Sequence, residues 1–326
     1  MSTATKARKL KRKKSTTYLG SWNLQGKATH LADLAIMSQD MKTRKIAVCA
    51  MQETMNEYAG ETRMENGDCY IFFGKQANGY GGLGFYVTSQ WVTRIANYRR
   101  INERIAVIRF YLKEPTAEEI GNRKGDLVII NVYGRTQIST KNHPELAEQF
   151  FQNLKDVYIR ERAGTDLIFI MGDYNSKIGR KLDGDGDFMG EHGKGERNQN
   201  GEQLRDFLEE TGLYLANTHF KHRPMQTATW HGGKPSQNTR QPQYRASQPG
   251  IHNQIDYIAV PKRQLRLFTD ARAYVPHLFK HRSDHSMLIA SVQLGAIYKL
   301  QPARIRKSQE QDVSILATSD DHRRAY

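Results

Sequence analysis

The sequence has little of several features, and each shortage excludes a class of protein. Only two cysteines, Cys49 and Cys69, occur in 326 residues, so disulfide bonds cannot hold a fold of this size, and we expect two buried free thiols in a reducing compartment. The longest apolar runs, 46–51 and 127–132, are far shorter than the ~20 residues that cross a bilayer. The first residues contain no apolar signal segment. We therefore expect an intracellular protein that does not span a membrane.

Acidic residues are scarce relative to basic ones. The chain has 49 Lys and Arg against 34 Asp and Glu, a net charge of +15. The segment KARKLKRKK (6–14) supplies +7 and the residues from Ala296 onward add +2, which leaves +6 on residues 16–295. This excess favours a polyanionic partner. Residues 1–15 are predicted to be a disordered basic tail, serving as a nuclear-import signal, a nucleic-acid arm or only a solvated terminus, and 296–326 a partly disordered extension.

Apolar residues, at 38% of the chain, are numerous enough for a large core. Apolar runs predict strands at 18–22, 46–51, 70–73, 84–88, 92–98, 104–112, 127–133, 167–171, 213–217, 254–260, 267–274 and 286–294. Amphipathic stretches predict helices at about 29–44, 144–162 and 201–211. This mixture of strands and helices indicates α/β layers with more than one sheet. Residues 231–253, rich in Gly, Pro, Gln, Asn and Arg, predict a long irregular loop.

Polar residues stand at the ends of six apolar strands, where a fold can hold them rigidly. SWN, QET, NVY and GDYN end or follow four strands, QIDYI places an acid inside a fifth, and SDH opens the last. These segments supply Asn23, Glu53, Asn131, Tyr133, Asp173, Asn175, Asp256, Asp284 and His285.

Such a set suits the hydrolysis of a phosphodiester or phosphomonoester bond. Carboxylate and amide oxygens are hard ligands that suit Mg²⁺, with Mn²⁺ as a substitute. An Asp can position and deprotonate a water, and a His held by a second Asp can stabilise charge on the phosphoryl oxygens. Because the developing negative charge would otherwise face several carboxylates, the metal is part of the prediction.

The six segments, in this order and approximate spacing, resemble the endonuclease/exonuclease/phosphatase superfamily, which includes DNase I-like enzymes and apurinic endonucleases. GDYNSKIG, GERNQNGEQL, LANTHFKHR, TATW and NQIDYI are similar to the apurinic-type endonuclease domain of RTE-like non-LTR retrotransposons and to craniofacial-development-protein-2-like proteins. The resemblance covers about residues 16–295 and implies that they form one domain. It implies a DNase I-like four-layer α/β sandwich, with two mixed β-sheets packed face to face and helices outside.

The resemblance also implies roles for matching residues. The metal would be held by Glu53, Asn23 and Asp284. The water and the phosphate would be handled by Asp173, Asn175, His285, Asp256 and Tyr133. In this scheme Asp173 orients or deprotonates the water, and His285, fixed by Asp256, stabilises the phosphoryl oxygens. Candidate DNA contacts are Arg135 and Trp230, although a tryptophan at this position could equally be a core residue.

Two positions depart from the superfamily pattern. Where an acid often stands two residues after the first Asn, this chain has Gln25, which removes one carboxylate from the metal's surroundings. Where relatives commonly have Ala-Pro or a similar pair after the Tyr, this chain has Gly134 and Arg135. The shape of that loop is therefore open, although Arg135 could contact phosphate in compensation.

The function implied is a Mg²⁺-dependent endonuclease that nicks one strand of duplex DNA in the nucleus and leaves a 3′-hydroxyl, with no membrane and no obligate protein partner. The chain is too short to include a reverse transcriptase, so we expect an isolated endonuclease domain, a truncated copy or a domesticated gene. Two alternatives stay open. One is a phosphomonoesterase or lipid phosphodiesterase of the same fold, of inositol-phosphate phosphatase or sphingomyelinase type. The other is a catalytically idle DNA- or chromatin-binding relative.

Overall fold

A computed structural model of the chain describes residues 16–26, 31–75, 81–113, 126–232, 252–276 and 283–296. The predicted tails and most of the predicted loop at 231–253 lie outside these residues. Cys49 and Cys69 are both buried and free, as predicted. Within the described ranges, every helix is too short or too polar to cross a bilayer.

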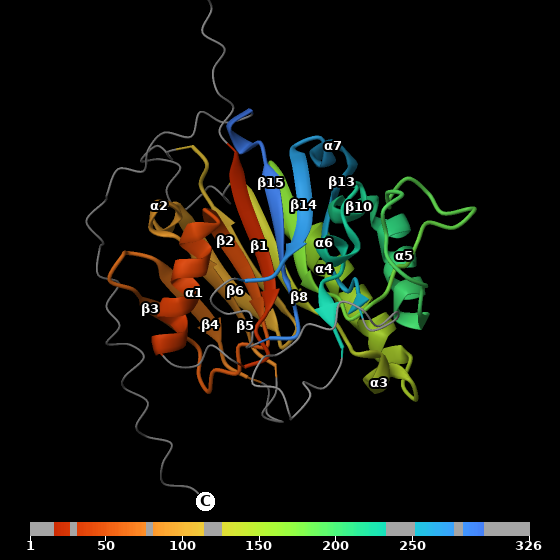
Figure 1. Cartoon of the computed structure of the whole chain (residues 1–326), viewed down its shortest axis with the longest axis horizontal. Helices are drawn as coiled ribbons and strands as arrows, with labels where there is room; N and C mark the ends of the chain where they lie inside the picture. Colours follow the sequence, from red (N-terminus) through yellow and green to blue (C-terminus); the bar gives the residue numbers. More distant parts are fainter. Residues whose placement is uncertain are drawn as a thin grey trace, which may run out of the picture.

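The first sheet has seven strands in the order β14-β15-β1-β2-β5-β4-β3 (Figure 1). At its centre β1 (Thr17–Asn23) and β2 (Ile46–Gln52) run parallel, and α1 (Leu31–Thr43) lies between them in the chain. The last described strand, β15 (Met287–Val292), pairs antiparallel with β1. The other strands are β3 (Gly60–Arg63), β4 (Cys69–Phe73), β5 (Leu83–Val87) and β14 (Phe268–Tyr274).

The second sheet has six strands in the order β10-β13-β9-β8-β7-β6. At its centre β8 (Leu127–Tyr133) and β9 (Leu167–Asp173) run parallel, with α4 (Glu145–Arg162) between them in the chain. The second sheet therefore repeats the strand–helix–strand unit of the first. The other strands are β6 (Ile95–Asn102), β7 (Ile105–Phe110), β10 (Leu213–Leu215) and β13 (Asp256–Pro261).

The two sheets pack face to face with helices outside. One apolar core lies between the sheets and draws on both, with Val48, Phe85, Ile108 and Phe169 among its members. A second core lies between the second sheet and the helices α4 and α5 (Gln199–Thr211), and a third lies under α1. In Figure 1 α1 is at the left, outside the first sheet, and α4 and α5 are at the right. This arrangement confirms the predicted four-layer sandwich of two mixed sheets.

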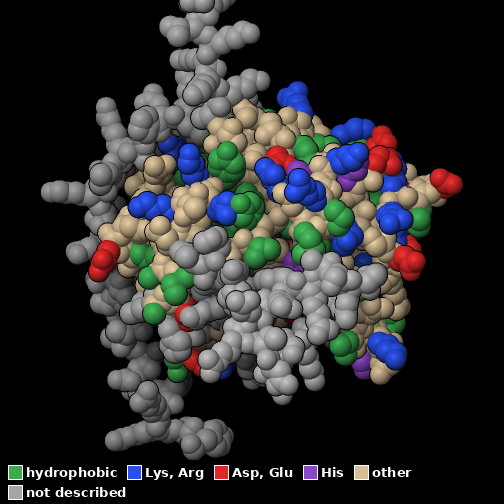
Figure 2. Space-filling model, in the orientation of Figure 1, with side chains coloured by type: hydrophobic (Ala, Val, Ile, Leu, Met, Phe, Trp, Pro, Cys, Tyr) green, Lys and Arg blue, Asp and Glu red, His purple; other side chains and the backbone are tan. Residues whose placement is uncertain are grey.

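The central strands are buried along almost their whole length because both faces of each sheet are covered. β2, β8 and β9 accordingly read as continuous apolar runs rather than as alternating ones. On the face shown in Figure 2, Lys and Arg side chains spread over the upper half, while Asp and Glu are fewer and lie mostly toward the periphery.

Several predicted elements differ locally from the structure. The strand predicted at 92–98 begins later, at Ile95 of β6, and a one-turn helix, α2 (Ser89–Val92), precedes it. The strand predicted at 213–217 stops at Leu215, and a 3-10 helix (Ala216–Thr218) follows. Other elements that the sequence did not predict include β3 and the one-turn helices α3 (Gln137–Thr140), α6 (Pro224–Thr227) and α7 (Lys262–Leu265). A single turn is too short to show a helical period, and β3 is an exposed polar strand without an apolar face.

The predicted loop at 231–253 is paired at its two ends, where irregular structure was expected. β11 (Trp230–His231) and β12 (His252–Asn253) form a two-stranded antiparallel ribbon. Trp230 also forms an isolated antiparallel bridge to His285. The ribbon therefore fixes both ends of this loop beside the strand that carries the SDH motif. A strand of two residues is too short to show an alternating pattern in the sequence.

Candidate active site

The six predicted motifs meet at one edge of the sandwich. β1, β2, β8 and β9 form two parallel pairs, and β1 lies against β9 and β2 against β8 where the sheets pack. β13 runs antiparallel to β9, and β15 runs antiparallel to β1. The edge therefore collects the carboxyl ends of four strands and the starting points of two others, which is why motifs far apart in sequence become neighbours.

Asn23 connects the two sheets at this edge. Its Nδ2 donates hydrogen bonds to Oε1 of Glu53 at 2.8 Å and to Oδ2 of Asp173 at 3.0 Å. The hydroxyl of Tyr133 donates to the same Glu53 oxygen at 2.9 Å. Asn23 and Asp173 are buried, whereas Glu53 and Tyr133 are half-buried. Four of the predicted residues thus form one hydrogen-bonded chain that opens toward solvent at Glu53.

Two of the predicted residues have strained backbones. Glu53 and Asn175 each have φ of 49°, a region that residues other than glycine seldom adopt. Asn175 is held there by two contacts: its backbone N–H donates to Oδ1 of Asp173 at 2.8 Å, and its Nδ2 donates to the carbonyl oxygen of Gly134 at 3.2 Å. Such strain persists only where the surroundings fix it, and it is concentrated at functional sites.

Asp173, Asp256 and His285 form the buried centre of the site. Asp256 is paired directly with Asp173 across β13 and β9. Nδ1 of His285 lies 3.0 Å from Oδ2 of Asp256, and its Nε2 lies 3.8 Å from Oδ2 of Asp173. One ligand atom from each residue lies within 4.8 Å of those from the other two. The arrangement brings three of the predicted catalytic residues into a single cluster.

Burial and mutual charge shift the pKa values in this cluster. Burial, reinforced by the charge of Asp256 and partly offset by His285, raises the pKa of Asp173 to about 7. Burial alone would lower the pKa of His285, but the carboxylates of Asp256 and Asp173 outweigh it and raise that pKa to about 10. The imidazole is therefore protonated at neutral pH, while Asp173 is close to half-ionised.

Asp284 is held at the edge by two further residues. Its Oδ2 accepts a hydrogen bond from Nε1 of Trp230 at 3.0 Å, and its backbone N–H donates to Oε1 of Gln25 at 3.1 Å. Burial raises the pKa of its carboxyl group. Gln25, which stands where relatives often carry an acid, therefore positions the backbone of Asp284. Trp230, predicted as a DNA contact, directs its indole N–H at a predicted metal ligand.

The donor atoms at this edge fit a hard divalent cation. Oδ1 of Asp256 and Oδ1 of Asp284 are buried and have no hydrogen-bond partner, and a buried carboxylate oxygen is costly unless a cation or water binds it. The tightest cluster, Asp173–Asp256–His285, differs from the predicted ligands, which include Glu53 and Asp284. The predicted ligands Glu53 and Asp284 offer carboxylate oxygens, which Mg²⁺ prefers, whereas the tight cluster includes an imidazole nitrogen.

Gly134, one of the two departures from the superfamily pattern, is required by close backbone packing. A Cβ atom at this position would lie 2.1 Å from the carbonyl oxygen of Tyr174. The Gly134 N–H donates to the carbonyl oxygen of Asp173 at 2.7 Å. The same packing requires Gly172, where a Cβ atom would lie 2.0 Å from the carbonyl oxygen of Val132. Only glycine lets the loop after β8 pass this close to the GDYN segment.

Asn131 supports the site from between the sheets. Its Nδ2 donates to the carbonyl oxygens of Met51 at 2.8 Å and Gly84 at 2.9 Å. Its Oδ1 accepts from Nε2 of Gln52 at 2.7 Å. Both side chains are fully buried, so this network fixes the strands that end in Glu53 and Tyr133. The sequence marked both residues as part of motifs but did not indicate this positioning role.

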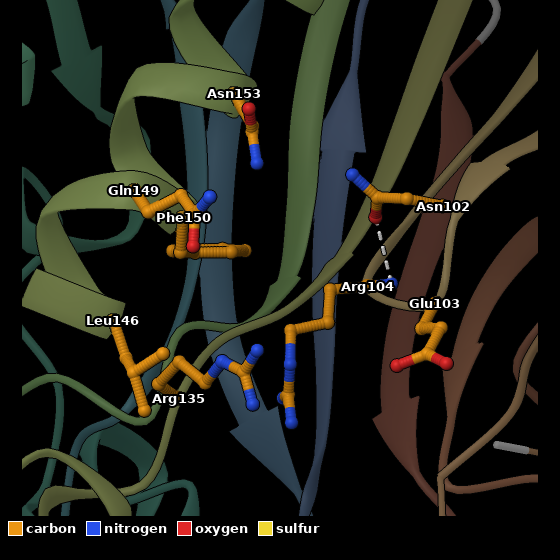
Figure 3. A pocket seen from close by; sticks show the side chains of 8 residues that line it. All are labelled: Asn102, Glu103, Arg104, Arg135, Leu146, Gln149, Phe150 and Asn153. Carbon is orange, nitrogen blue, oxygen red and sulfur yellow. Dashed lines mark hydrogen bonds between the residues drawn. The ribbon is translucent and has the colours of Figure 1, made fainter. Parts of the chain in front are cut away.

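Arg104 is the residue at the site that sequence reasoning missed. Its Nη1 donates to the carbonyl oxygens of Tyr133 at 3.1 Å and Gly134 at 2.9 Å. It stands just before β7 and follows Glu103, so in sequence it is indistinguishable from an ordinary surface charge. The predicted DNA contact Arg135 lies beside it in the structure (Figure 3).

Comparison with known proteins supports the fold. No protein-family model matches the chain. Craniofacial development protein 2 of Tragulus javanicus and that of Bos taurus are each 24% identical to it over 278 residues, 85% of this chain. The matched part is 42% and 41% of those proteins, so the chain spans about two fifths of the length of the curated relatives it matches.

Two solved structures show the same architecture. The AP endonuclease LMAP from Leishmania major is 13% identical, with a TM-score of 0.57 over 85% of this chain and 87% of that one. The endonuclease domain of TRAS1, a telomere-specific non-LTR retrotransposon, is 17% identical, with a TM-score of 0.51 over 86% of this chain and 100% of that one. The chain therefore has the DNase I-like fold of the endonuclease/exonuclease/phosphatase superfamily, as the six motifs predicted.

Proposed function

We propose that the chain is a Mg²⁺-dependent endonuclease that hydrolyses phosphodiester bonds of duplex DNA and leaves a nick with a 3′-hydroxyl. The observation that carries the proposal is the joining of the Asn23–Glu53–Tyr133 chain to the Asp173–Asp256–His285 cluster at one edge of the sandwich. The two solved structures of the same fold are endonucleases by name, and the basic charge of the chain suits a polyanion.

Glu53, Asp284 and Asn23 would hold the metal, with Mn²⁺ as a substitute. The carboxylate oxygens of Glu53 and Asp284 are hard donors, and Oδ1 of Asp284 has no hydrogen-bond partner, although Nε2 of His285 lies 3.8 Å from it. Oδ1 of Asn23 accepts a hydrogen bond from the backbone N–H of Gln25 at 3.0 Å, so Asn23 would act chiefly by holding Glu53. The bound ion would neutralise charge on the phosphate and make the attacking water more acidic. The hydrogen bond from Asn23 to Glu53 would keep the amide and the carboxylate in a fixed relative position.

Asp173 would accept the proton of the attacking water. A pKa of about 7 is close to that of an efficient general base at neutral pH. Asn23 and the backbone N–H of Asn175 each donate to one of its oxygens and so fix the carboxylate. Fixing the base in this way keeps its free lone pairs directed at the water.

His285 would stabilise the phosphoryl oxygens. Asp256 holds Nδ1, so the protonated Nε2 stays directed toward Asp173 and the space beside it. A charged donor fixed in a buried site stabilises developing negative charge more than the same group in water. Asn175 and the hydroxyl of Tyr133 would hold the scissile phosphate from the other side.

A plasmid assay tests the proposal. Supercoiled plasmid would be incubated with the protein and Mg²⁺, with EDTA and Asp173→Ala controls, alongside inositol phosphates and sphingomyelin. We expect open-circular plasmid only with the intact protein and metal. Hydrolysis of an inositol phosphate or sphingomyelin without nicking would support the phosphomonoesterase or lipid phosphodiesterase alternative. DNA binding without hydrolysis of any substrate would indicate an idle relative.

The chemistry of the nick can be read directly from the product. A DNA polymerase extends a nick only from a 3′-hydroxyl, so nicked plasmid from the first assay should incorporate labelled nucleotide without further treatment. If the polymerase extends the nick only after treatment with a 3′-phosphatase, the cleavage leaves a 3′-phosphate, and the proposed 3′-hydroxyl product is wrong.

We also propose a nuclear location and a retrotransposon origin. The basic segment 6–14 and the likeness to the TRAS1 domain support them. A fluorescent fusion compared with one lacking residues 6–14 tests the location, and uniform distribution of both fusions would contradict it.

A further inference from the structure

A cavity of about 230 Å³ lies beside the candidate active site (Figure 3). Asn102 and Arg104 reach it from the turn between β6 and β7, and Arg135 reaches it from the loop after β8. Gln149 and Phe150, from the first turns of α4, complete another side. The mechanism proposed above uses none of these side chains.

Two guanidinium groups meet in this cavity with donors unused. Figure 3 shows the ends of Arg104 and Arg135 next to each other. Arg104 gives its Nη1 to two backbone carbonyl oxygens, yet the Nε atoms of Arg104 and Arg135 are both buried without a hydrogen-bond partner. Buried donors in folded proteins are nearly always satisfied, so these two atoms point to a ligand that accepts hydrogen bonds.

The charge of the pair makes that ligand an anion. Glu103 also lines the cavity, but across the described ranges neither guanidinium forms an ion pair with it or with another carboxylate. One carboxylate and two neutral carbonyls do not offset two positive charges. Burial, followed by the neighbouring charge of Arg135, lowers the pKa of Arg104 to about 10. Arg104 is still charged at neutral pH, so the pair gains from a bound anion that relieves its repulsion.

The side chain of Tyr133 lies between the guanidinium pair and Glu53. The Cζ atom of Arg104 lies over the ring of Tyr133, 5.2 Å from the centroid, and the hydroxyl at the far end of that ring donates to Glu53. Tyr133 therefore separates the two positions, with the guanidinium pair on one side and the predicted metal ligand on the other. Neighbouring phosphates of one strand could occupy the two positions together.

We propose that Arg104 and Arg135 form a second phosphate subsite, which binds a phosphate group adjacent to the scissile one. The inference rests on the proposed nuclease function and specifies how that site holds its substrate. Guanidinium groups present paired N–H donors that match phosphate oxygens. Leu146 and Phe150 add an apolar wall to the cavity, which suits the sugar attached to the phosphate. Two sources present this phosphate, a strand-internal diester and the terminal monoester at a nick, and the modified duplexes below distinguish them.

DNA binding in EDTA tests the subsite separately from catalysis. Anisotropy of a labelled duplex with one central nick, the proposed product, would be measured at several salt concentrations. We expect Arg135→Ala to weaken binding about tenfold and to reduce the slope of log K against log salt by about 0.9, the contribution of one phosphate. Arg135→Lys keeps the charge but loses the paired N–H donors of the guanidinium. This variant should therefore keep the salt slope of the intact protein and bind the duplex more weakly.

Arg263→Ala is the matched control. Arg263 is exposed and lies on α7, which Figure 1 places at the top of the molecule, far from α3 and the loop of Arg135. The Arg263→Ala substitution removes the same charge as Arg135→Ala. We expect the DNA affinity of this variant and its slope of log K against log salt to equal those of the intact protein. Equal losses in Arg135→Ala and Arg263→Ala would show an effect of net charge only and would overturn the subsite.

Modified duplexes identify the source of the phosphate. One series carries a single neutral methylphosphonate at successive linkages beside the nick, and another has or lacks the 5′-phosphate at the nick. At the recognised phosphate, the modification should weaken DNA binding by the intact protein. It should leave DNA binding by the Arg135→Ala variant unchanged. If every modification weakens both proteins equally, the subsite is wrong. If neither protein binds any duplex, the proposed DNA substrate is wrong, and the subsite falls with it.

Discussion

Asp256 and His285 lie 3.0 Å apart, Oδ2 to Nδ1, and both are buried. Asp256 comes from the start of a strand in one sheet, and His285 immediately precedes a strand of the other. Their contact therefore ties the two sheets together at the candidate active site. It also orients the imidazole, because the atom that Asp256 does not hold, Nε2, is left to face Asp173 at 3.8 Å.

Replacing His285 should slow nicking without removing the metal. His285→Ala takes away a fixed charged donor, and we expect a fall in the single-turnover rate of about 10²-fold or more. Asp256→Asn should have a smaller effect, since the imidazole stays but loses its orientation and part of its charge. A His285→Ala protein that is folded by circular dichroism and nicks at near-normal rate would exclude the proposed role.

Asp173→Asn should abolish most of the nicking activity but leave the affinity for DNA unchanged. The amide has nearly the same shape as the carboxylate but cannot accept a proton, so we expect a rate loss of about 10²–10⁴-fold, the range for a missing general base. Affinity for a nicked duplex in EDTA should not fall. Comparable losses in binding and rate would show that Asp173 acts in substrate binding.

Glu53→Gln should raise the Mg²⁺ concentration needed for half-maximal nicking. Removing one carboxylate from the proposed ligands should weaken metal affinity by at least the roughly 10–100-fold seen when residues around metal sites are changed. Glu57→Gln is the matched control, because Glu57 is an exposed residue of the same loop that pairs with Lys75. An identical Mg²⁺ dependence in the two variants would remove Glu53 from the metal site.

The metal-free protein should become less stable as pH rises. His285 has a pKa of about 10 in the folded chain against 6.5 without its surroundings, so its contribution is complete below about 6.5 and disappears as pH approaches 10. Asp173, whose pKa is raised from 3.8 to about 7, acts in the same direction over the lower range. Urea midpoints in EDTA at pH 6, 8 and 10 should therefore decrease, and His285→Gln should flatten the decrease above pH 6.5.

Gly134→Ala should destabilise the fold and impair the site together. The new Cβ atom would lie 2.1 Å from the carbonyl oxygen of Tyr174, so one backbone must move, at a cost of about 1–3 kcal/mol. Gly212→Ala is a useful comparison: its Cβ would meet nothing within 4 Å, but its φ is 66°, so it should cost only about 1 kcal/mol. Equal urea midpoints for the two variants would contradict the packing argument.

The sequence predicted the fold and the members of the site better than it predicted their contacts. Continuous apolar runs gave the central strands, and polar residues at their ends gave Glu53 and Asp173, because both signals are local. The dual hydrogen bond of Asn23 and the support from Gln25 to Asp284 depend on how two sheets pack, which no local pattern encodes. Arg104 was missed for the same reason: only the folded chain brings it beside Arg135.

The pairing of β1 with β15 has a consequence for how the protein is made. Trp22 bonds through its indole N–H to the carbonyl oxygen of His285, 263 residues later, and β15 covers one edge of β1. A ribosome therefore releases β1 long before β15 exists, and contacts this distant in sequence form slowly. The exposed edge of β1 would be open to wrong pairing during synthesis. Since His285 arrives in the same late segment, a partly synthesised chain would lack the proposed catalytic centre, and hydrolysis would begin only after this segment has docked.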